Sequence, residues 1–423
     1  MKELFLHYIW QYQRYRHDSL ATTDDIPLHV LHPGHQNDDA GPDFHDARIR
    51  IHDLTWVGRV EIHIRSSDWI AHQHDGDQRY DNVILHVVWT HDRDIYLANG
   101  EKIPTLELMG RVSESLIAKS NSLISSPQPI ACAPKPASTD DILRAAQVSK
   151  SLVDRLREKS EAVLEELSKT NGDWEETTYR HLAGCFGGHL NKEPFLTLSR
   201  SLPLRILRRH SENPKQISAL LYGMAGFLEG KASDEYHQQL QDEFQFLLVK
   251  YDLEVILSRY HWRFHRTRPA NFPTVRMAQF ASMLLGTPDL YYLTNFKDKD
   301  ALKASLAKDA DQYWMDHYDL GKESRQPLKS VGKAFVKGLM INGIVPILAA
   351  SSIHFDEPEK MERAISLLEG SAAENNKITR SMIAAGFLND NAADSQGLLQ
   401  LYRHHCKKKR CLACNIGVSI LKP

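Results

Sequence analysis

The stretch GPDFHDARIRIHDLTWVGRVEIHIRSSDW, residues 41–69, contains two segments in which apolar and polar residues alternate. In residues 47–51, apolar side chains occupy every second position, and residues 56–65 repeat that pattern. Successive side chains of a β-strand point to opposite faces, so each segment predicts a strand with one apolar face. The second strand carries Glu61 and His63 on its polar face, two residues apart.

The segments around this stretch predict the rest of an N-terminal sheet. Residues 2–16 have apolar residues at helical spacing, whereas IPLHVLH (26–32) reads as a short strand. NVILHVVW (82–89) is apolar on both faces apart from one histidine, which indicates a central, covered strand. IYLANGEKIPTLEL (95–108) predicts a further hairpin that turns near Asn99-Gly100.

The composition changes after this region and suggests how the chain is divided. Residues 1–120 are expected to form an α/β domain with a mixed or antiparallel sheet, and residues 121–138, rich in Ser, Pro and Ala, a linker. Residues 139–423 carry long amphipathic patterns typical of helices and end in a cysteine-rich knuckle at 404–417. The predicted fold class is α+β, an α/β domain followed by a mostly α-helical domain.

Overall composition limits the classes of function. The chain has 423 residues, 42% of them hydrophobic and 25% charged, as in a globular protein of two or three domains. The formal net charge is only −2, so a nucleic-acid partner would have to meet a local basic patch. The sequence has neither the pattern of a signal peptide nor an apolar run of about 18 residues, which predicts a cytoplasmic protein without a membrane partner.

Residues 42–43 and 61–63 form a candidate active site. Two converging carboxylates can hold a hard divalent cation, which polarises a phosphoryl oxygen and acidifies a water. Pro42-Asp43 and Glu61-Ile62-His63 resemble the motif of the PD-(D/E)xK nuclease-like superfamily, with His63 in place of the usual Lys. The resemblance implies that Asp43 and Glu61 hold Mg²⁺ or Mn²⁺ and that Glu3, on the first helix, assists.

Strand geometry leaves the position of Asp43 open. If the hairpin turns near Leu54-Thr55, Asp43 lies about 13 Å from the level of Glu61, and only a bulge or bend would bring them together. Asp46 is nearer and is the substitute acid. The alternative is that Glu61 and His63 lie on a solvent face and form cross-strand ion pairs without chemistry.

A second group of candidate ligands lies just downstream. His72 and His74 are two residues apart, and His86 interrupts an apolar strand, where a buried imidazole needs polar partners. Three histidines and a carboxylate can hold a transition metal, as in a cupin-like barrel acting on a small molecule. The alternative is a polar loop with turn chemistry at residues 75–77.

The C-terminal cysteines predict a second metal site. Cys406, Cys411 and Cys414 have C-x4-C-x2-C spacing, which can bring three thiolates to one tetrahedral Zn²⁺. His405 is the expected fourth ligand, with His404, Cys132 and Cys185 as other choices. An iron-sulfur cluster is the less favoured cofactor, and three unligated thiols are the alternative without a metal.

Two basic stretches are candidates for nucleic-acid contacts. One is the run between the cysteines, and the other interleaves arginines with aromatic residues at positions 262–276, a pattern that suits phosphate contacts and base stacking. The alternatives are a solvated tail and a packing corner between helices. The candidate residues are Lys407, Lys408, Lys409, Arg410, Arg263, Arg266 and Arg268.

The segments GPDF, VEIH, SSDW, NVILHVVW, RPANFPT and CLACNIG together resemble one uncharacterised bacterial family, a domain of unknown function that spans nearly the whole chain. That resemblance implies no activity. The leading functional hypothesis is a metal-dependent nuclease or related phosphodiesterase. The others are a non-catalytic nucleic-acid-binding or scaffold protein that retains the fold, and the cupin-like metalloenzyme. The sequence predicts no oligomeric state.

Overall fold

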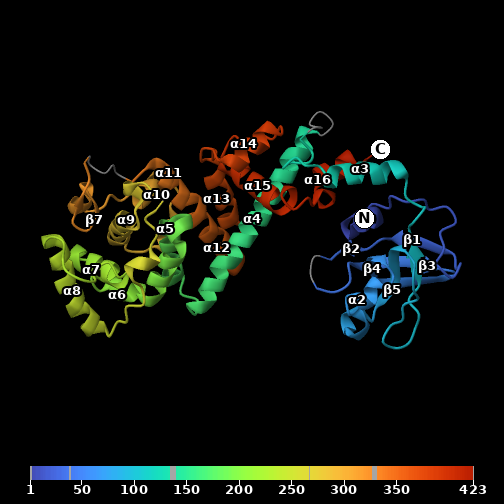
Figure 1. The fold of residues 1–423 in the computed structure, drawn as a ribbon, viewed down its shortest axis with the longest axis horizontal. Helices are drawn as coiled ribbons and strands as arrows, with labels where there is room; N and C mark the ends of the chain where they lie inside the picture. The colour runs from blue at the N-terminus through green and yellow to red at the C-terminus, as the bar shows by residue number, and fades with distance from the viewer. Residues whose placement is uncertain (1, 38–39, 134–139, 266, 326–330, 423) are drawn as a thin grey trace. The chain divides into compact units, whose positions relative to one another are not determined.

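The computed structural model describes residues 2–37, 40–133, 140–265, 267–325 and 331–422, and it is an α+β protein (Figure 1). Its contacts divide the chain into two compact units. The first unit contains residues 1–151, 375–388 and 398–423, and the second contains residues 152–374 and 389–397. The N-terminal sheet and the C-terminal cysteines therefore belong to the same unit.

The sheet of the first unit is mixed, as the sequence predicts, and has the strand order β1-β3-β4-β5-β6. β1 and β4 flank β3 as antiparallel neighbours, whereas β4 pairs with β5, and β5 with β6, in parallel. The short β2 pairs with the start of β3. The strands are β1 (Leu28–His32), β2 (His35–Gln36), β3 (Phe44–Ile51), β4 (Leu54–Arg65), β5 (Val83–Thr90) and β6 (Thr105–Glu107).

Helix α1 (Glu3–Gln11) packs on the apolar side of this sheet. The predicted helix over 2–16 is shorter in the structure because Gln13 adopts a left-handed φ of 51° and turns the chain out of the helix. The predicted hairpin near Asn99-Gly100 is reduced to one bridge, between Tyr96 and Lys102, and β6 joins the sheet in parallel instead. Helix α3 (Glu114–Ile124) follows β6.

The C-terminal segment belongs to the core of the first unit. Leu412, Val418 and Leu421 pack in the same hydrophobic cluster as α1 and the sheet. Figure 1 shows the red C-terminal helix α16 (Asn415–Ile420) beside the cyan α3, in agreement with the shared cluster. The end of the chain and its beginning are thereby held together.

The second unit is almost wholly helical among its described residues. Residues 333–355 form one apolar helical stretch, with a π-turn at Met340–Ile344, that is long enough to cross a membrane. However, 72% of its most apolar window is buried inside the unit, as in a core helix of a globular protein. The helices of this unit include α5 (Trp174–Ser201), α7 (Pro214–Met224), α8 (Glu235–Tyr251), α9 (Pro273–Gly286), α11 (Lys333–Leu339), α12 (Val345–Phe355) and α13 (Pro358–Glu369). Two helices, α4 (Asp141–Lys169) and α15 (Ala392–Leu401), are shared between the units, and α14 (Lys377–Ala384) belongs to the first.

Candidate metal centre

Strand β4 supplies two buried polar side chains to the centre of the first unit. Glu61 is 4% exposed and His63 is fully buried. Alternation along the strand turns Val60 and Ile62 toward the core with α1, and His63 toward Trp69, whose ring lies edge-on at 6.3 Å. The alternative in which Glu61 and His63 lie on a solvent face is therefore wrong, because both side chains are buried.

Asp43 lies beside Glu61, which corrects the register expected from the sequence. The hairpin closes between Ile51 and Leu54, earlier than predicted, and a bulge between Phe44 and Ala47 shifts the pairing further. As a result, the Asp43 amide donates to Glu61 Oε2 at 3.0 Å, and the Asp43 carboxylate accepts from the Ile62 amide at 3.0 Å. The two acids converge because of this hairpin register and bulge.

The loop after β4 brings two more histidines to the same place. Trp69, on the short helix α2 (Asp68–Ala71), is buried, and Gln73 turns the chain with a φ of 62° between His72 and His74. The Tyr80 ring stacks on His74 with 3.9 Å between centroids. These aromatic contacts position a loop that the sequence pattern alone describes only as polar.

The ligand atoms of His63, His72 and His74 all lie within 4.8 Å of one another. His63 Nε2 is 3.1 Å from His72 Nδ1. Glu61 Oε1 lies 3.3 Å from His74 Nε2 and 3.6 Å from His63 Nε2. Three imidazole nitrogens gathered within 4.8 Å, with one carboxylate oxygen beside two of them, have the composition of a transition-metal site.

His86 fixes the orientation of His63 from the neighbouring strand. β5 pairs in parallel with β4 so that His86 lies opposite Glu61, and His86 Nε2 is 2.9 Å from His63 Nδ1. If His63 Nε2 binds a metal, its Nδ1–H must donate to His86. His86 would then carry its own proton on Nδ1. His86 is therefore a positioning residue behind the ligand set.

Helix α1 adds a second acid–base pair next to the histidines. His7 Nε2 is 3.2 Å from Asp43 Oδ2, and Glu3 lies one helical turn earlier on the same side of α1. The Glu3 carboxyl interacts electrostatically with Asp43, His7 and His72, so it lies near this group; its assisting role stays a prediction. His7 is absent from the sequence-based candidates, although its spacing of four residues from Glu3 could have indicated it.

Burial controls the protonation of this group. Burial, together with the neighbouring imidazoles, lowers the pKa of His63 to about 2 and that of His86 to about 3. Both rings are thus neutral at physiological pH, as metal ligation and its support require. Burial opposes a charge on His7, but its hydrogen bond and charge interaction with Asp43 raise its pKa overall. Burial together with Asp43 also raises the pKa of Glu3.

The Glu61 carboxyl makes the metal-free protein less stable as pH rises. Burial raises its pKa from 4.5 to about 7, so the folded state keeps a proton that the unfolded state has lost between these values. We therefore expect Glu61→Gln to stabilise the EDTA-treated protein above pH 7, by roughly 3 kcal/mol at most, with no difference near pH 4. Urea unfolding of both proteins across this pH range measures the difference in their free energies of unfolding. Equal pH dependence of both proteins would contradict the burial argument.

Asp46→Asn is the matched control. Asp46 is exposed on the bulge with a φ of 58°, and it pairs with His45 at 2.8 Å. It therefore lies outside the ligand group and is not the substitute acid. The hydrogen bond from His45 lowers the pKa of Asp46. Since this shift is opposite in sign to that of Glu61, Asp46→Asn must not reproduce the stabilisation.

The predicted nucleic-acid contacts are divided between the two units. In the second, Trp262 is buried and donates to the Ala225 carbonyl, as in a packing corner, whereas Arg263 and Arg268 are exposed. Arg266 falls outside the described residues. In the first unit, Lys407, Lys408 and Arg410 are exposed, and the Lys409 ammonium donates to the Gln128 carbonyl.

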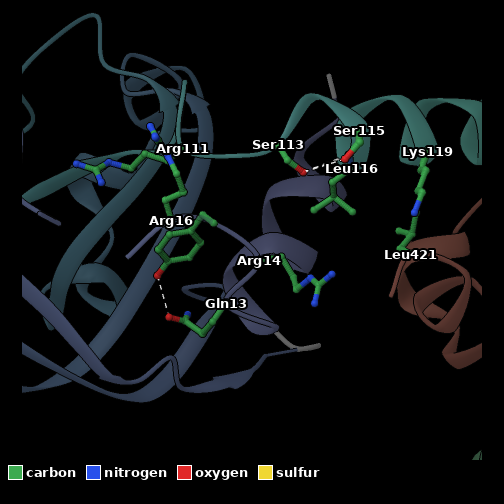
Figure 2. Close-up of a pocket in the computed structure, with 10 residues that line it drawn as sticks. Gln13, Arg14, Arg16, Arg111, Ser113, Ser115, Leu116, Lys119 and Leu421 are labelled. Carbon is green, nitrogen blue, oxygen red and sulfur yellow. Dashed lines mark hydrogen bonds between the residues drawn. The ribbon is translucent and has the colours of Figure 1, made fainter. Parts of the chain in front are cut away.

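A basic pocket of about 390 Å³ lies where the chain leaves α1 and meets α3 (Figure 2). Figure 2 shows Arg16 and Arg111 on one side of it and Lys119 on the other, with Arg14 between. Arg16 and Arg111 donate to backbone carbonyls, and among the described residues no carboxylate lines the pocket. This pocket was not identified from the sequence, although Arg14 and Arg16 lie two residues apart just after α1.

The fold and the site define the class of protein: an α+β protein with a histidine- and carboxylate-rich candidate metal centre on a mixed sheet. The chain belongs to the family described as "Protein of unknown function (DUF2851)", whose model matches residues 3–377. The match includes the whole metal-centre group but ends before the C-terminal cysteines. No curated protein and no solved structure shows a significant match to the chain.

Proposed function

We propose that this protein is a metal-dependent phosphodiesterase that cleaves nucleic acid. The observation that carries the proposal is the gathering of His63, His72 and His74 within 4.8 Å, with Glu61 beside two of them and Asp43 hydrogen-bonded to the strand that carries Glu61. Glu61 and His63 are buried in this group, and a buried polar side chain is costly unless its polar atoms are satisfied. A metal ion satisfies all of them at once.

The donor set favours a borderline metal over Mg²⁺. Imidazole nitrogens suit Zn²⁺ and related transition metals, whereas Mg²⁺ prefers oxygen ligands and retains several waters. Glu61 adds an oxygen donor that Mn²⁺ also accepts. We therefore propose Mn²⁺ or Zn²⁺ at this site, a shift from the Mg²⁺ or Mn²⁺ expected from two carboxylates alone.

Each residue has a role in hydrolysis. A divalent ion held by the histidines and Glu61 supplies Lewis-acid polarisation of the phosphoryl oxygen. The Asp43–His7 pair is the proposed general base: His7 takes a proton from the attacking water, while Asp43 orients and charge-stabilises the imidazole. The water oxygen joins phosphorus, one P–O ester bond breaks, and the leaving oxygen takes up a proton. Glu3 adds negative charge beside His7.

Two features support a nucleic-acid substrate. The N-terminal helix followed by strands, with Asp43 after a proline and Glu61 two residues before His63, suits the PD-(D/E)xK superfamily, although His63 is neutral where that motif has a lysine. The basic pocket near the end of α1 offers phosphate-binding cations. Since α1 is nine residues long, its two ends are roughly 12 Å apart, so one polynucleotide could reach both.

The histidine cluster also favours a second candidate, a metalloenzyme acting on a small molecule. Cupins are antiparallel double-sheet barrels, whereas β4, β5 and β6 pair in parallel here. The ligand residues therefore suit a cupin-like metalloenzyme, but the sheet differs from a cupin barrel. A non-catalytic nucleic-acid-binding protein would leave the buried ligand group without a purpose.

The test is cleavage of labelled single- and double-stranded DNA and RNA, and of bis(p-nitrophenyl) phosphate, with Mn²⁺, Zn²⁺ or Mg²⁺. We expect hydrolysis that needs Mn²⁺ or Zn²⁺ and stops with EDTA. Metal binding without cleavage of any phosphodiester would favour the small-molecule enzyme. Nucleic-acid binding without metal binding would favour the non-catalytic protein.

The basic pocket gives a separate prediction about substrate binding. Replacing Arg14 and Lys119 by Ala removes two cations that make no ion pair within the described residues. We expect DNA affinity to fall uniformly across sequences and the slope of log affinity against log salt to decrease by about 2. Fluorescence anisotropy at several salt concentrations measures this. An unchanged slope would exclude the pocket from the binding surface; Lys2→Ala, at the exposed start of α1, is the control.

A further inference from the structure

Four of the five cysteines of this chain lie in one region of the first unit. Cys406 and Cys414 belong to a single hydrophobic cluster, and Cys132 packs against it. Each of Cys406 and Cys411 lies within electrostatic range of the other three thiols. Cys185 is instead in the second unit, where its thiol donates to the Asn342 carbonyl.

The backbone around these cysteines is shaped to hold them. Cys411 and Cys414 are joined by a 3₁₀ turn in which the Cys414 amide donates to the Cys411 carbonyl at 3.2 Å. A Cβ on Gly417 would lie 2.0 Å from that carbonyl oxygen, so only glycine lets α16 approach the turn. Burial raises the pKa of the Cys414 thiol, and hydrogen bonds from the backbone amides of Gly417 and Ile416 oppose that shift. This is the geometry of a knuckle that presents two sulfurs to one ion.

Cys132 is brought to the knuckle from a distant part of the chain. It lies in a turn in which the Ala133 amide donates to the Ile130 carbonyl at 3.0 Å. Ile130 packs in the same cluster as Cys406, and Lys409 donates to the nearby Gln128 carbonyl. The turn therefore adds a fourth sulfur without using His405.

We propose that Cys132, Cys406, Cys411 and Cys414 form a four-thiolate Zn²⁺ site. Among the described residues, His63, His72 and His74 are the group whose ligand atoms lie within 4.8 Å of one another. The four sulfurs do not meet this distance, so they are more widely spaced than in a closed site. Sulfurs on one Zn²⁺ at about 2.3 Å lie roughly 3.8 Å apart. Ion binding therefore draws the Cys132 turn and the knuckle together.

The surrounding charges match such a site. A zinc ion with four thiolates carries a net charge of −2, and a buried dianion needs cations nearby. The positive charge of Lys409 favours the thiolate forms of Cys132, Cys406 and Cys411. Arg144 has the same effect on Cys132, and Lys150 has it on Cys414. Part of the basic run at 407–410 thus compensates the metal site, a role that the sequence-based assignment to phosphate contacts overlooks.

The site has a structural consequence for the metal centre. Within the knuckle, the proposed ligand Cys411 is followed directly by Leu412, which packs with α1 in the core of the sheet. Since α1 carries Glu3 and His7, zinc at the cysteines would fix the helix that supports the Asp43–His7 pair. Zinc at the cysteines would affect the histidine group only through the position of α1, because none of the four thiols belongs to that group.

The test uses the full chain loaded with Co²⁺, since only cysteine ligation gives thiolate-to-cobalt charge transfer. We expect one tetrahedral cobalt per chain with this band, and its displacement by Zn²⁺. Cys132→Ser should weaken binding at least about 100-fold and shift the spectrum, whereas Cys185→Ser and His405→Ala should leave both unchanged. Reading the charge-transfer band separates this site from the histidine centre.

Three outcomes would overturn the proposal: no charge-transfer band in the folded protein, loss of the band in His405→Ala with retention in Cys132→Ser, or iron with an iron-sulfur absorption spectrum in the purified protein. Circular dichroism checks that each variant folds. Because Cys406→Ser alters a different ligand, it must give the same loss as Cys132→Ser if all four sulfurs bind one ion. Activity at the histidine centre plays no part in this readout.

Discussion

Glu61→Gln and Asp43→Asn should each abolish metal-dependent cleavage, with a fall in kcat on the order of 1,000-fold. Glu61 supplies the oxygen donor that lies 3.3 Å from His74 and 3.6 Å from His63. Asp43 orients His7, and its loss leaves that imidazole without its partner at 3.2 Å. The two variants test different steps of the proposed mechanism, in which Glu61 holds the ion and Asp43 orients the base.

The metal dependence separates these two roles. For Glu61→Gln we expect a higher metal concentration at half-maximal activity, whereas Asp43→Asn should keep the metal affinity and lose turnover. Asp46→Asn, the exposed acid on the bulge, should behave as wild type in both measurements. Full activity of Glu61→Gln would remove the carboxylate from the mechanism, and full activity of Asp43→Asn would remove the proposed base.

His72→Ala and His74→Ala should each weaken Mn²⁺ or Zn²⁺ binding at the N-terminal site by at least about 100-fold. Each removes one of the three nitrogens that lie within 4.8 Å of one another. His72 is exposed and His74 half-buried, so neither change leaves a large cavity and the fold should survive. Isothermal titration calorimetry of the chain with its cysteine site blocked by alkylation measures the change.

His29→Ala is the matched control for these histidines. His29 is exposed on β1, outside the ligand group. Equal metal affinity in His29→Ala and wild type, with loss in His72→Ala and His74→Ala, would assign binding to the cluster. If all four proteins bound alike, the loop histidines would not be ligands, and the proposed donor set would fail.

The sequence predicted those parts of the fold that depend on local pattern. Period-two alternation located β3 and β4 and placed Glu61 and His63 on one side of the strand, because side-chain direction follows directly from strand geometry. The apolar run of β5 indicated a central strand, and the need for partners predicted that His86 would join the polar group. The α+β class followed from the change from alternating to helical periodicity.

The position of Asp43 depended on facts that local pattern does not contain. A shift of the hairpin turn changes every cross-strand pair, and the bulge at Asp46 adds a further register shift. Likewise, His72 and His74 reach the site because Trp69 and Tyr80 pack beneath their loop, which is a tertiary effect. Cys132 is far from the other cysteines in the sequence, so cysteine spacing alone left it as one of several candidates for the fourth ligand.

The most direct test of the central claim is the anomalous diffraction of a crystal grown with Mn²⁺, measured on both sides of the manganese absorption edge. The account predicts one peak bounded by His63 Nε2, His72 Nδ1, His74 Nε2 and Glu61 Oε1. A crystal with Mn²⁺ present and no peak at this point, or a peak held by other residues, would contradict the proposed metal centre and the function built on it.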